Sequence, residues 1–350
     1  MNNELKFGTY FPWYSWEDAV KTVKYAEENG FDSVWMADHP ADWAPVEHLE
    51  LWTTMSALAA ITKKIELCFG VTDPHRRHPS TMAHGAVTID YISKGRLKFG
   101  IGPGEAMNLV PYGVNWNKPV SKLEETIMVM KKLWTEKSVD FNGEFFKLKD
   151  AILPTKPIQK PHPPIYIGSH GPRALEVTAK LADGWYPFLL TKQKFEDSLK
   201  FIREKAKKFG RDPSKIEPIL ELIAVVGKDN DKAVEDASFL TRAVASLWPQ
   251  VLNDLNLNQY SKEELGLLKW TCSDLNLQHL VDHTLQIPWE PEKWLGKALV
   301  VAGDSDAVID QLEGYVKAGV KHFSFFTPKD NIQTTLECTS KSIIPYFKGK

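Results

Sequence analysis

Residues 98–108 read KFGIGPGEAMN, an apolar, strand-like stretch that runs into three glycines and an acid. Gly100, Gly102 and Gly104 have nearly the spacing of a dinucleotide-binding turn, but that fingerprint follows the first strand of its domain and is completed by an acid about 20 residues later. Here the glycines follow the fourth apolar run, and the next acids fall inside a segment of helical period. The stretch instead predicts a glycine-rich turn at the carboxyl end of a strand, where backbone amides approach a flat or anionic ligand.

Short apolar runs alternate with longer amphipathic segments on both sides of this turn. Repeated strand-then-helix units predict a parallel sheet. Eight such units in 350 residues are typical of a closed (β/α)8 TIM barrel, because an open doubly wound sheet usually has about five to seven strands. The predicted strands are residues 5–11, 32–38, 65–71, 96–102, 164–169, 184–190, 218–227 and 322–328.

We interpret residues 1–350 as a single TIM-barrel domain. Two segments in it are longer than the strand-then-helix repeat requires. Residues 135–163 predict a hairpin followed by a proline-marked linker. Residues 230–297 are mostly of helical pattern and carry several tryptophans, so we expect an insertion that caps the barrel mouth. An accessory core or a subunit interface fits the same tryptophans equally well.

Composition excludes several classes of function. Lysine and arginine total 43 against 45 acids, a net charge of −2, which leaves no basic footprint for nucleic acid or an anionic membrane. No apolar run approaches the roughly 20 residues that cross a bilayer. The three cysteines lack metal-ligand spacing, and the first residues lack a secretion signal. We therefore expect a cytoplasmic protein with a small-molecule substrate and no metal site.

Polar residues follow several predicted strands where each strand ends. Asp38 and His39 follow the second strand and Ser169 follows the fifth. Because the carboxyl ends of all barrel strands meet at one mouth, we expect these residues to converge there with Glu105. A His39–Glu105 pair beside exposed backbone suits acid–base catalysis. Taken singly, His39 also fits a core histidine, Asp38 a helix N-cap and Glu105 a partner of a helix dipole.

Three longer stretches carry a family resemblance. SVWMADHPADW (33–43), GVTDPHRRHPSTMAHGAVTIDYISKGRLKFGIGPGEAMN (70–108) and PIYIGSHGPRALEVTAKLADGW (164–185) together resemble the bacterial luciferase-like superfamily, in its branch of oxidoreductases that depend on coenzyme F420, an 8-hydroxy-5-deazaflavin. The resemblance covers nearly the whole chain. It implies a luciferase-like barrel, a homodimer, F420 bound in the barrel mouth, and hydride transfer.

The resemblance also implies roles for individual residues. A non-prolyl cis peptide that backs the ring is implied within residues 69–71. His39 matches a general base that accepts a hydroxyl proton, Glu105 a carboxylate beside the ring, and Trp43 an aromatic wall of the substrate position. His75 and His78 are interpreted as surface or cofactor-tail contacts. Cofactor contacts are expected for Asp38, Phe69, Gly70, Val71, Gly102, Gly104, Glu105, Asn108, Gly168, Ser169, His170 and Gly171.

The details of the motifs favour one substrate class over others. DHPADW follows the alcohol-oxidising pattern of the branch, so we expect hydride transfer between F420 and an alcohol or carbonyl substrate. An F420-dependent methylenetetrahydromethanopterin reductase is the first alternative, although Thr9 stands where those enzymes carry a carboxylate. A sugar phosphate is disfavoured because Ala298 falls where the glucose-6-phosphate dehydrogenases carry an arginine. An FMN-dependent luciferase-like monooxygenase and a non-catalytic deazaflavin-binding homologue are the remaining alternatives.

Overall fold

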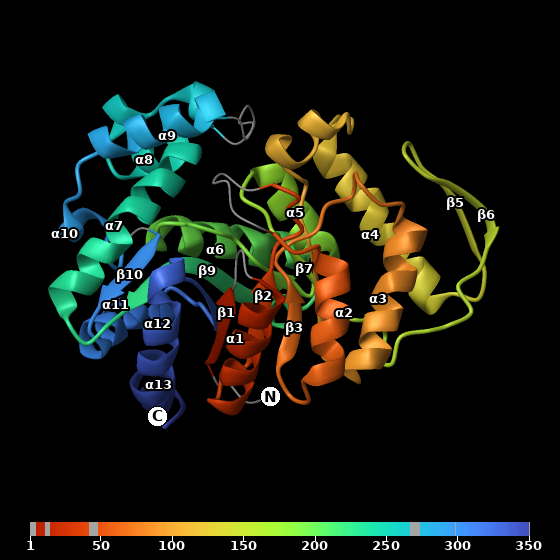
Figure 1. The fold of residues 1–350 in the computed structure, drawn as a ribbon. Coiled ribbons are helices and arrows are strands. Elements are labelled where there is room, and N and C mark those ends of the chain that lie inside the picture. Colours follow the sequence, from red (N-terminus) through yellow and green to blue (C-terminus); the bar gives the residue numbers. More distant parts are fainter. Residues whose placement is uncertain (1–4, 11–14, 42–47, 267–273, 298, 350) are drawn as a thin grey trace.

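The computed structural model describes residues 5–10, 15–41, 48–266, 274–297 and 299–349. Within these residues, eight parallel strands close into a barrel that helices surround (Figure 1), which confirms the predicted fold. Neighbours around the barrel follow the order β1-β2-β3-β4-β7-β8-β9-β11 and back to β1. The barrel strands are β1 (Lys6–Tyr10), β2 (Ser33–Met36), β3 (Glu66–Phe69), β4 (Leu97–Ile101), β7 (Ile165–Ile167), β8 (Gly184–Trp185), β9 (Glu217–Val226) and β11 (His322–Phe326).

The helices pack their apolar faces against the outside of the barrel. Among the described residues, no helix combines the length and the apolar character that a membrane crossing requires. The α-helices are α1 (Trp16–Glu28), α2 (Leu51–Ile61), α3 (Pro79–Ser93), α4 (Pro119–Thr135), α5 (Pro172–Leu181), α6 (Lys192–Lys208), α7 (Asn230–Leu247), α8 (Pro249–Asp254), α9 (Asp274–Gln286), α10 (Pro291–Trp294), α11 (Ser305–Lys317), α12 (Ile332–Cys338) and α13 (Ile344–Lys348).

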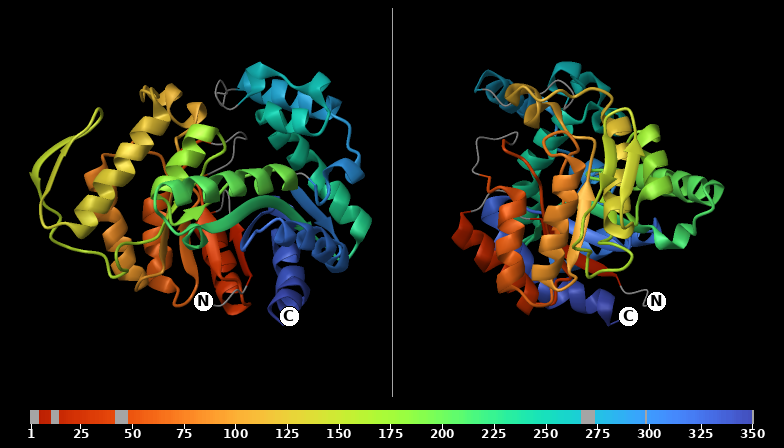
Figure 2. Two further views of the ribbon diagram at one scale, coloured as in Figure 1. Left: turned by 180° about the vertical axis from the view of Figure 1, so that it is seen from behind. Right: turned by 90° about the vertical axis from the view of Figure 1, so that its right-hand side faces the viewer.

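The two segments that exceed the repeat lie at different places on the barrel. Residues 135–163 contain β5 (Val139–Asn142) and β6 (Lys147–Ala151), which pair antiparallel. Residues 230–297 contain α7 to α10. Figure 1 and the left view of Figure 2 show the hairpin outside α4, far from α8 and α9. In Figure 1, α8 and α9 lie at the opposite end of the molecule from α13.

One strand escaped the sequence analysis. β10 (Val300–Gly303) pairs in parallel with the carboxyl-terminal half of β9, where Val300 lies opposite Ile223. β9 is long enough to pair with β11 along its first half and with β10 along its second. A four-residue apolar run at the end of a helical insertion has no periodicity that distinguishes strand from helix, so the sequence did not predict it.

Aromatic side chains fill the barrel interior below its mouth. The rings of Trp35 on β2 and Tyr186 after β8 stack 4.1 Å apart with an interplanar angle of 6°. Gly8 on β1 makes room for this layer, because a Cβ there would lie 2.1 Å from Oγ of Ser33 and 2.9 Å from Nε1 of Trp35. The interior is therefore a packed core that forms a floor under the mouth.

A partly buried polar network closes the amino-terminal end of the barrel. The carboxylate of Glu217 accepts a hydrogen bond of 2.5 Å from the Tyr166 hydroxyl. It also lies 3.6 Å from Nδ1 of His322 and 3.9 Å from Nζ of Lys6. The other ring nitrogen of His322 makes a 2.7 Å hydrogen bond with the Ser33 hydroxyl. The network thus joins β1, β2, β7, β9 and β11 at the end of the barrel away from the mouth.

This network makes stability depend on pH. Burial by itself raises the pKa of Glu217, but His322, Lys6 and the Tyr166 hydroxyl outweigh it and hold the pKa well below its ordinary value of 4.5. Such a carboxyl stabilises the fold above its unfolded pKa, and the contribution is lost as pH falls below that value. We expect Glu217→Gln to lower the free energy of unfolding by about 1–3 kcal/mol at neutral pH. On acidification from about pH 5 to pH 3, the variant should lose less of its free energy of unfolding than the wild type does. Urea unfolding at several pH values measures both, and identical pH profiles for the variant and the wild type would contradict the assignment.

Candidate active site

A cavity of about 660 Å³ lies at the carboxyl ends of the barrel strands. This volume is typical of a site for a small molecule or cofactor. Phe69 does not line it, because its side chain points outside the barrel and packs with its ring 4.8 Å from that of Trp52. Trp43 lies outside the described residues. The expected site residues that do line the cavity are Asp38, His39, Gly70, Val71, Gly102, Gly104, Glu105, Asn108, Gly168, Ser169, His170 and Gly171.

The glycines of the opening motif fit against an unusual backbone segment of the neighbouring strand. The Gly70–Val71 peptide bond is cis and lies within the range expected from the family resemblance. A Cβ on Gly100 would lie 1.8 Å from the carbonyl oxygen of Phe69, and one on Gly102 would lie 2.9 Å from Cγ2 of Val71. The glycines therefore allow the end of β4 and the turn after it to pack directly against this segment, so that backbone forms one wall of the cavity.

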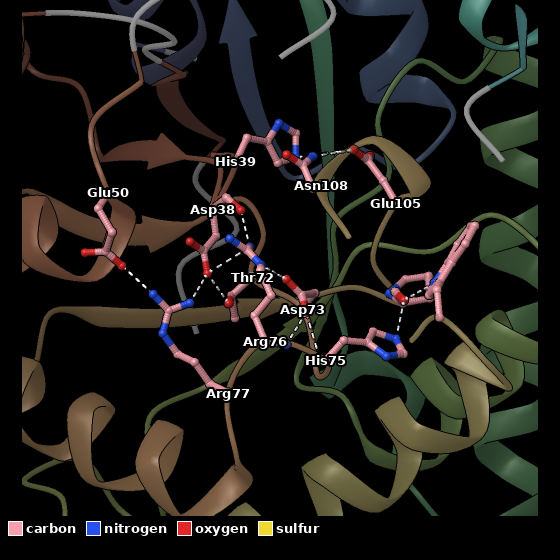
Figure 3. A network of polar contacts seen from close by, with 12 residues as sticks. Asp38, His39, Glu50, Thr72, Asp73, His75, Arg76, Arg77, Glu105 and Asn108 are labelled. Carbon is pink, nitrogen blue, oxygen red and sulfur yellow. Dashed lines mark hydrogen bonds and ion pairs between the residues drawn. The ribbon is translucent and has the colours of Figure 1, made fainter. Parts of the chain in front are cut away.

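His39 and Glu105 come together at the mouth although they follow different strands. Nε2 of His39 lies 3.4 Å from Oε2 of Glu105 (Figure 3). Asn108 donates a 3.3 Å hydrogen bond from Nδ2 to the same oxygen of Glu105, and its Oδ1 accepts one of 3.4 Å from the amide of Ala41. Asn108 therefore ties the loop after β4 to the loop after β2 and holds the pair in place.

The contacts of His39 suggest which of its nitrogens carries a proton. With Nε2 facing the Glu105 carboxylate, the neutral ring places its hydrogen on Nε2 and a lone pair on Nδ1. Nδ1 is buried and has no hydrogen-bond partner within the described part of the chain. A histidine beside a carboxylate can act as a base, because the carboxylate stabilises the cation that forms.

Asp38 lines the cavity, but its carboxylate is engaged in holding loops together. Oδ2 accepts hydrogen bonds from the Thr72 hydroxyl at 2.6 Å and from Nη1 of Arg77 at 2.8 Å. Arg76 lies 3.3 Å from the same oxygen (Figure 3). With only 2% of its surface exposed, Asp38 joins the end of β2 to the loop after β3 and positions the adjacent His39.

In the loop after β3, Asp73 and Arg76 line the cavity although the sequence analysis did not single them out, whereas His75 and His78, interpreted as surface or cofactor-tail contacts, do not line it. Asp73 binds Nε of Arg76 at 2.5 Å and accepts hydrogen bonds from the amides of His75 and Arg76. A ring nitrogen of His75 lies 3.1 Å from the carbonyl of Pro103, and burial lowers the pKa of His75. His78 caps α3 by accepting a 3.2 Å hydrogen bond from the amide of Ser80. The paired arginines directly after a strand-ending acid, TDPHRR, were the available signal.

The loop after β7 brings the amino-terminal end of α5 to the cavity. Gly171 is the N-cap of this helix and supplies no side-chain cap for the first amides. The free amides and the helix dipole make such an end favourable for an anionic group. The Ser169 hydroxyl lies 2.9 Å from that of Thr178, which anchors the loop to the helix. Burial lowers the pKa of His170 to about 4, so its ring is neutral at physiological pH.

Apolar residues form another part of the cavity wall. Leu247 and Trp248 come from the end of α7, and Phe326 ends β11. The Trp248 ring packs edge-on against Phe188 with a centroid distance of 5.4 Å, and Phe188 packs against Phe326 at 5.8 Å. The helical insertion thus supplies part of the cavity wall.

Two further lining residues, Tyr186 and Glu221, were also missed. The Tyr186 hydroxyl donates a hydrogen bond to the Glu221 carboxylate on β9. The sequence did contain a signal for Glu221, because this acid interrupts the otherwise apolar strand PILELIAVV. A strand buried on both faces reads as a continuous apolar run, so an isolated acid within it marks a special position.

Comparison with known proteins assigns this arrangement to a family. A family model described as luciferase-like monooxygenase matches residues 6–322. A phthiodiolone/phenolphthiodiolone dimycocerosates ketoreductase of Mycobacterium bovis is 26% identical over 359 residues, which cover 94% of this chain and 92% of the relative.

Two solved structures share the fold along almost their whole lengths. A coenzyme F420 dependent tetrahydromethanopterin reductase from Methanopyrus kandleri has a TM-score of 0.84 at 26% identity and covers 99% of this chain and 100% of its own. An F420-dependent secondary alcohol dehydrogenase in complex with an F420–acetone adduct has a TM-score of 0.78 at 25% identity. The match covers 97% of this chain and 98% of the dehydrogenase. The chain therefore belongs to the luciferase-like monooxygenase family, and within it resembles oxidoreductases that depend on coenzyme F420.

Proposed function

We propose that this protein is a coenzyme F420-dependent oxidoreductase that transfers a hydride between the deazaflavin and an alcohol or carbonyl substrate. The observation that carries the proposal is the 3.4 Å contact between His39 and Glu105 at the rim of the cavity that the Gly70–Val71 peptide backs. One cavity thus combines an acid–base pair with a wall of backbone. The likeness to two solved F420-dependent enzymes supports the choice of cofactor.

The cavity residues fit a flat, tailed cofactor. Gly102 and Gly168 face Val71 so closely that a Cβ would lie 2.9 Å and 3.3 Å from its Cγ2, which leaves a smooth wall against which a planar ring can lie. The amino-terminal end of α5 beside Gly171 suits the phosphate of the cofactor tail. When bound, F420 supplies a ring carbon that accepts or donates a hydride, without the oxygen chemistry of a flavin.

The protein's own residues would manage the proton of the reaction. In alcohol oxidation, His39 would accept the hydroxyl proton while the carbinol carbon gives up a hydride, so the substrate loses one hydride and one proton in all. The carboxylate of Glu105 balances the charge that His39 gains, and Asn108 fixes that carboxylate. In carbonyl reduction the same residues return the proton.

The walls favour a substrate with an apolar body and no phosphate over a sugar phosphate. Leu247, Trp248 and Phe326 offer apolar surface. The two arginines of the described lining are already paired, since Arg76 binds Asp73 at 2.5 Å and Arg173 binds Glu124 at 2.6 Å. A second phosphate would have to compete with these carboxylates.

Spectroscopic titration tests the function. We expect the protein to bind F420, and a secondary alcohol such as cyclohexanol to bleach the near-violet absorption band of the oxidised cofactor. FMN is the comparison for the monooxygenase alternative, and glucose 6-phosphate for the sugar-phosphate alternative. Binding of FMN in preference to F420 would overturn the proposal. Binding of F420 without bleaching by any alcohol would support the non-catalytic alternative instead.

A methylenetetrahydromethanopterin reductase is the second candidate. The structural likeness to the Methanopyrus kandleri reductase, with a TM-score of 0.84, favours it. Thr9, in place of the carboxylate expected in such enzymes, speaks against it. Oxidation of reduced F420 by methylenetetrahydromethanopterin, but not by acetone or cyclohexanone, would establish this candidate over the first.

A further inference from the structure

Two acids on the same face of β9 are held in the same way but lie in different surroundings. Glu217 and Glu221 are four residues apart, so both side chains point into the barrel. Each accepts a hydrogen bond from a tyrosine hydroxyl, Glu217 from Tyr166 and Glu221 from Tyr186. Glu217 lies at the closed end, where Lys6 and His322 face it. Glu221 lies nearer the mouth and lines the floor of the cavity.

The Glu221 carboxylate is fixed in position by rigid neighbours. The residue is 4% exposed. Tyr186, which donates to it, is clamped by its stack on Trp35. The Tyr186 hydroxyl also lies 3.3 Å from that of Ser324, which pairs with Glu221 across β11 and β9. A side chain held this firmly presents its carboxylate to the cavity in one orientation.

Glu221 lies close to both the cis peptide and the apolar wall of the cavity. A Cβ on Gly70 would lie 3.0 Å from the Tyr186 hydroxyl, so the Tyr186–Glu221 pair lies directly under the cis peptide that backs the cavity. Glu221 also neighbours the apolar wall. Its backbone forms an isolated β-bridge with Phe188, and Phe326 lines the same cavity. A ligand that fills the cavity to its floor therefore meets an acid between aromatic rings.

We propose that Glu221, positioned by Tyr186, is a specificity-determining residue that selects substrates carrying a hydrogen-bond donor, a hydroxyl or a protonated amine, at the end that reaches the barrel floor. An apolar group beside the carboxylate would add no polar contact, whereas a hydroxyl or ammonium would add a charge-assisted hydrogen bond to it. Sites built around such a polar group reject analogues that lack its partner. This inference rests on the proposed function, because it assumes that the substrate occupies this cavity beside F420.

Ligand selectivity tests the inference separately from turnover. Dissociation constants of cyclohexanol, 1,4-cyclohexanediol and 4-aminocyclohexanol are measured on the F420-loaded protein from changes in the cofactor absorption band. The wild type is expected to bind the two compounds with a second donor at least about tenfold more tightly than cyclohexanol. Glu221→Gln is expected to abolish most of this preference for the amine, and Tyr186→Phe to weaken it with the aromatic stack preserved.

Glu217→Gln is the matched control, since it makes the same chemical change on the same strand at the closed end. It is expected to lower stability and leave the ligand preference unchanged. An absent preference in the wild type, or an unchanged preference in Glu221→Gln, would overturn the inference. A tenfold weaker affinity of Glu221→Gln for F420 itself would also overturn it, because Glu221 would then serve the cofactor. Failure of the wild type to bind F420 would instead count against the proposed function, and calorimetric titration of the protein with the same three ligands would still test Glu221.

Discussion

The His39→Asn variant is expected to lose about 10²–10⁴-fold in kcat with an alcohol substrate, the range that a positioned general base contributes. Asparagine can accept a hydrogen bond from the hydroxyl but cannot take up its proton at neutral pH. Cofactor affinity should change little, because we propose that the glycine wall and the end of α5 supply those contacts. Steady-state kinetics beside F420 titration separates the two effects.

His78→Asn is the matched control for this variant. His78 is exposed, lies outside the cavity lining and caps α3, and asparagine is a good N-cap. Its kcat should equal that of the wild type. If His39→Asn retained wild-type kcat at normal cofactor affinity, the assignment of the base would be wrong, and Glu105 would become the first residue to test in its place.

Gly100→Ala is expected to destabilise the protein by about 3 kcal/mol, the upper part of the range for overpacking. The new Cβ would lie 1.8 Å from the carbonyl oxygen of Phe69, and this contact is with backbone, which cannot rotate away. The two strands are also tied by the hydrogen bond of 3.1 Å from the amide of Thr72 to the carbonyl of Gly100. Any relief would move the Gly70–Val71 segment, so F420 affinity should fall as well. Urea unfolding and F420 titration measure the two losses.

Gly314→Ala provides the comparison of the same substitution in open surroundings. Gly314 lies inside α11, and a Cβ there would meet only the Lys192 side chain, at 3.5 Å. Because alanine is the better helix former, the free energy of unfolding of this variant should rise by about 0.5–1 kcal/mol. Equal urea midpoints for Gly100→Ala and the wild type would show that the strands can separate without cost, against the close packing described above.

The sequence predicted the barrel because parallel strands leave a strong pattern. Eight apolar runs alternate with helical segments, and the family motifs near His39, Gly100 and Ser169 fall at strand ends, where the barrel brings them together. The approach of His39 and Glu105 followed from that rule alone. β10 was missed because a short apolar run next to a helical insertion resembles either element.

The parts of the site that escaped prediction depend on side-chain direction and pairing. Alternation along a strand puts the side chain of Phe69 on the outer face, which a motif match does not reveal. Asp38 reads as a ligand contact until Arg76 and Arg77 are seen to share its carboxylate. The role of Glu221 emerges only when Tyr186, 35 residues earlier, is found to hold it. Each of these depends on three-dimensional partners that no local pattern encodes.

The cavity has two walls of different chemical origin, and this has an evolutionary consequence. One wall is main chain, formed by Gly102, Gly168 and the cis peptide, and it offers almost no side chain for mutation to alter. The other wall carries Leu247 and Trp248 from a segment inserted between barrel strands. Selection can therefore diversify the second wall, by substitution or by changing the length of the insertion, while the first stays a constant template. New specificities can arise on this scaffold without rebuilding the main-chain wall.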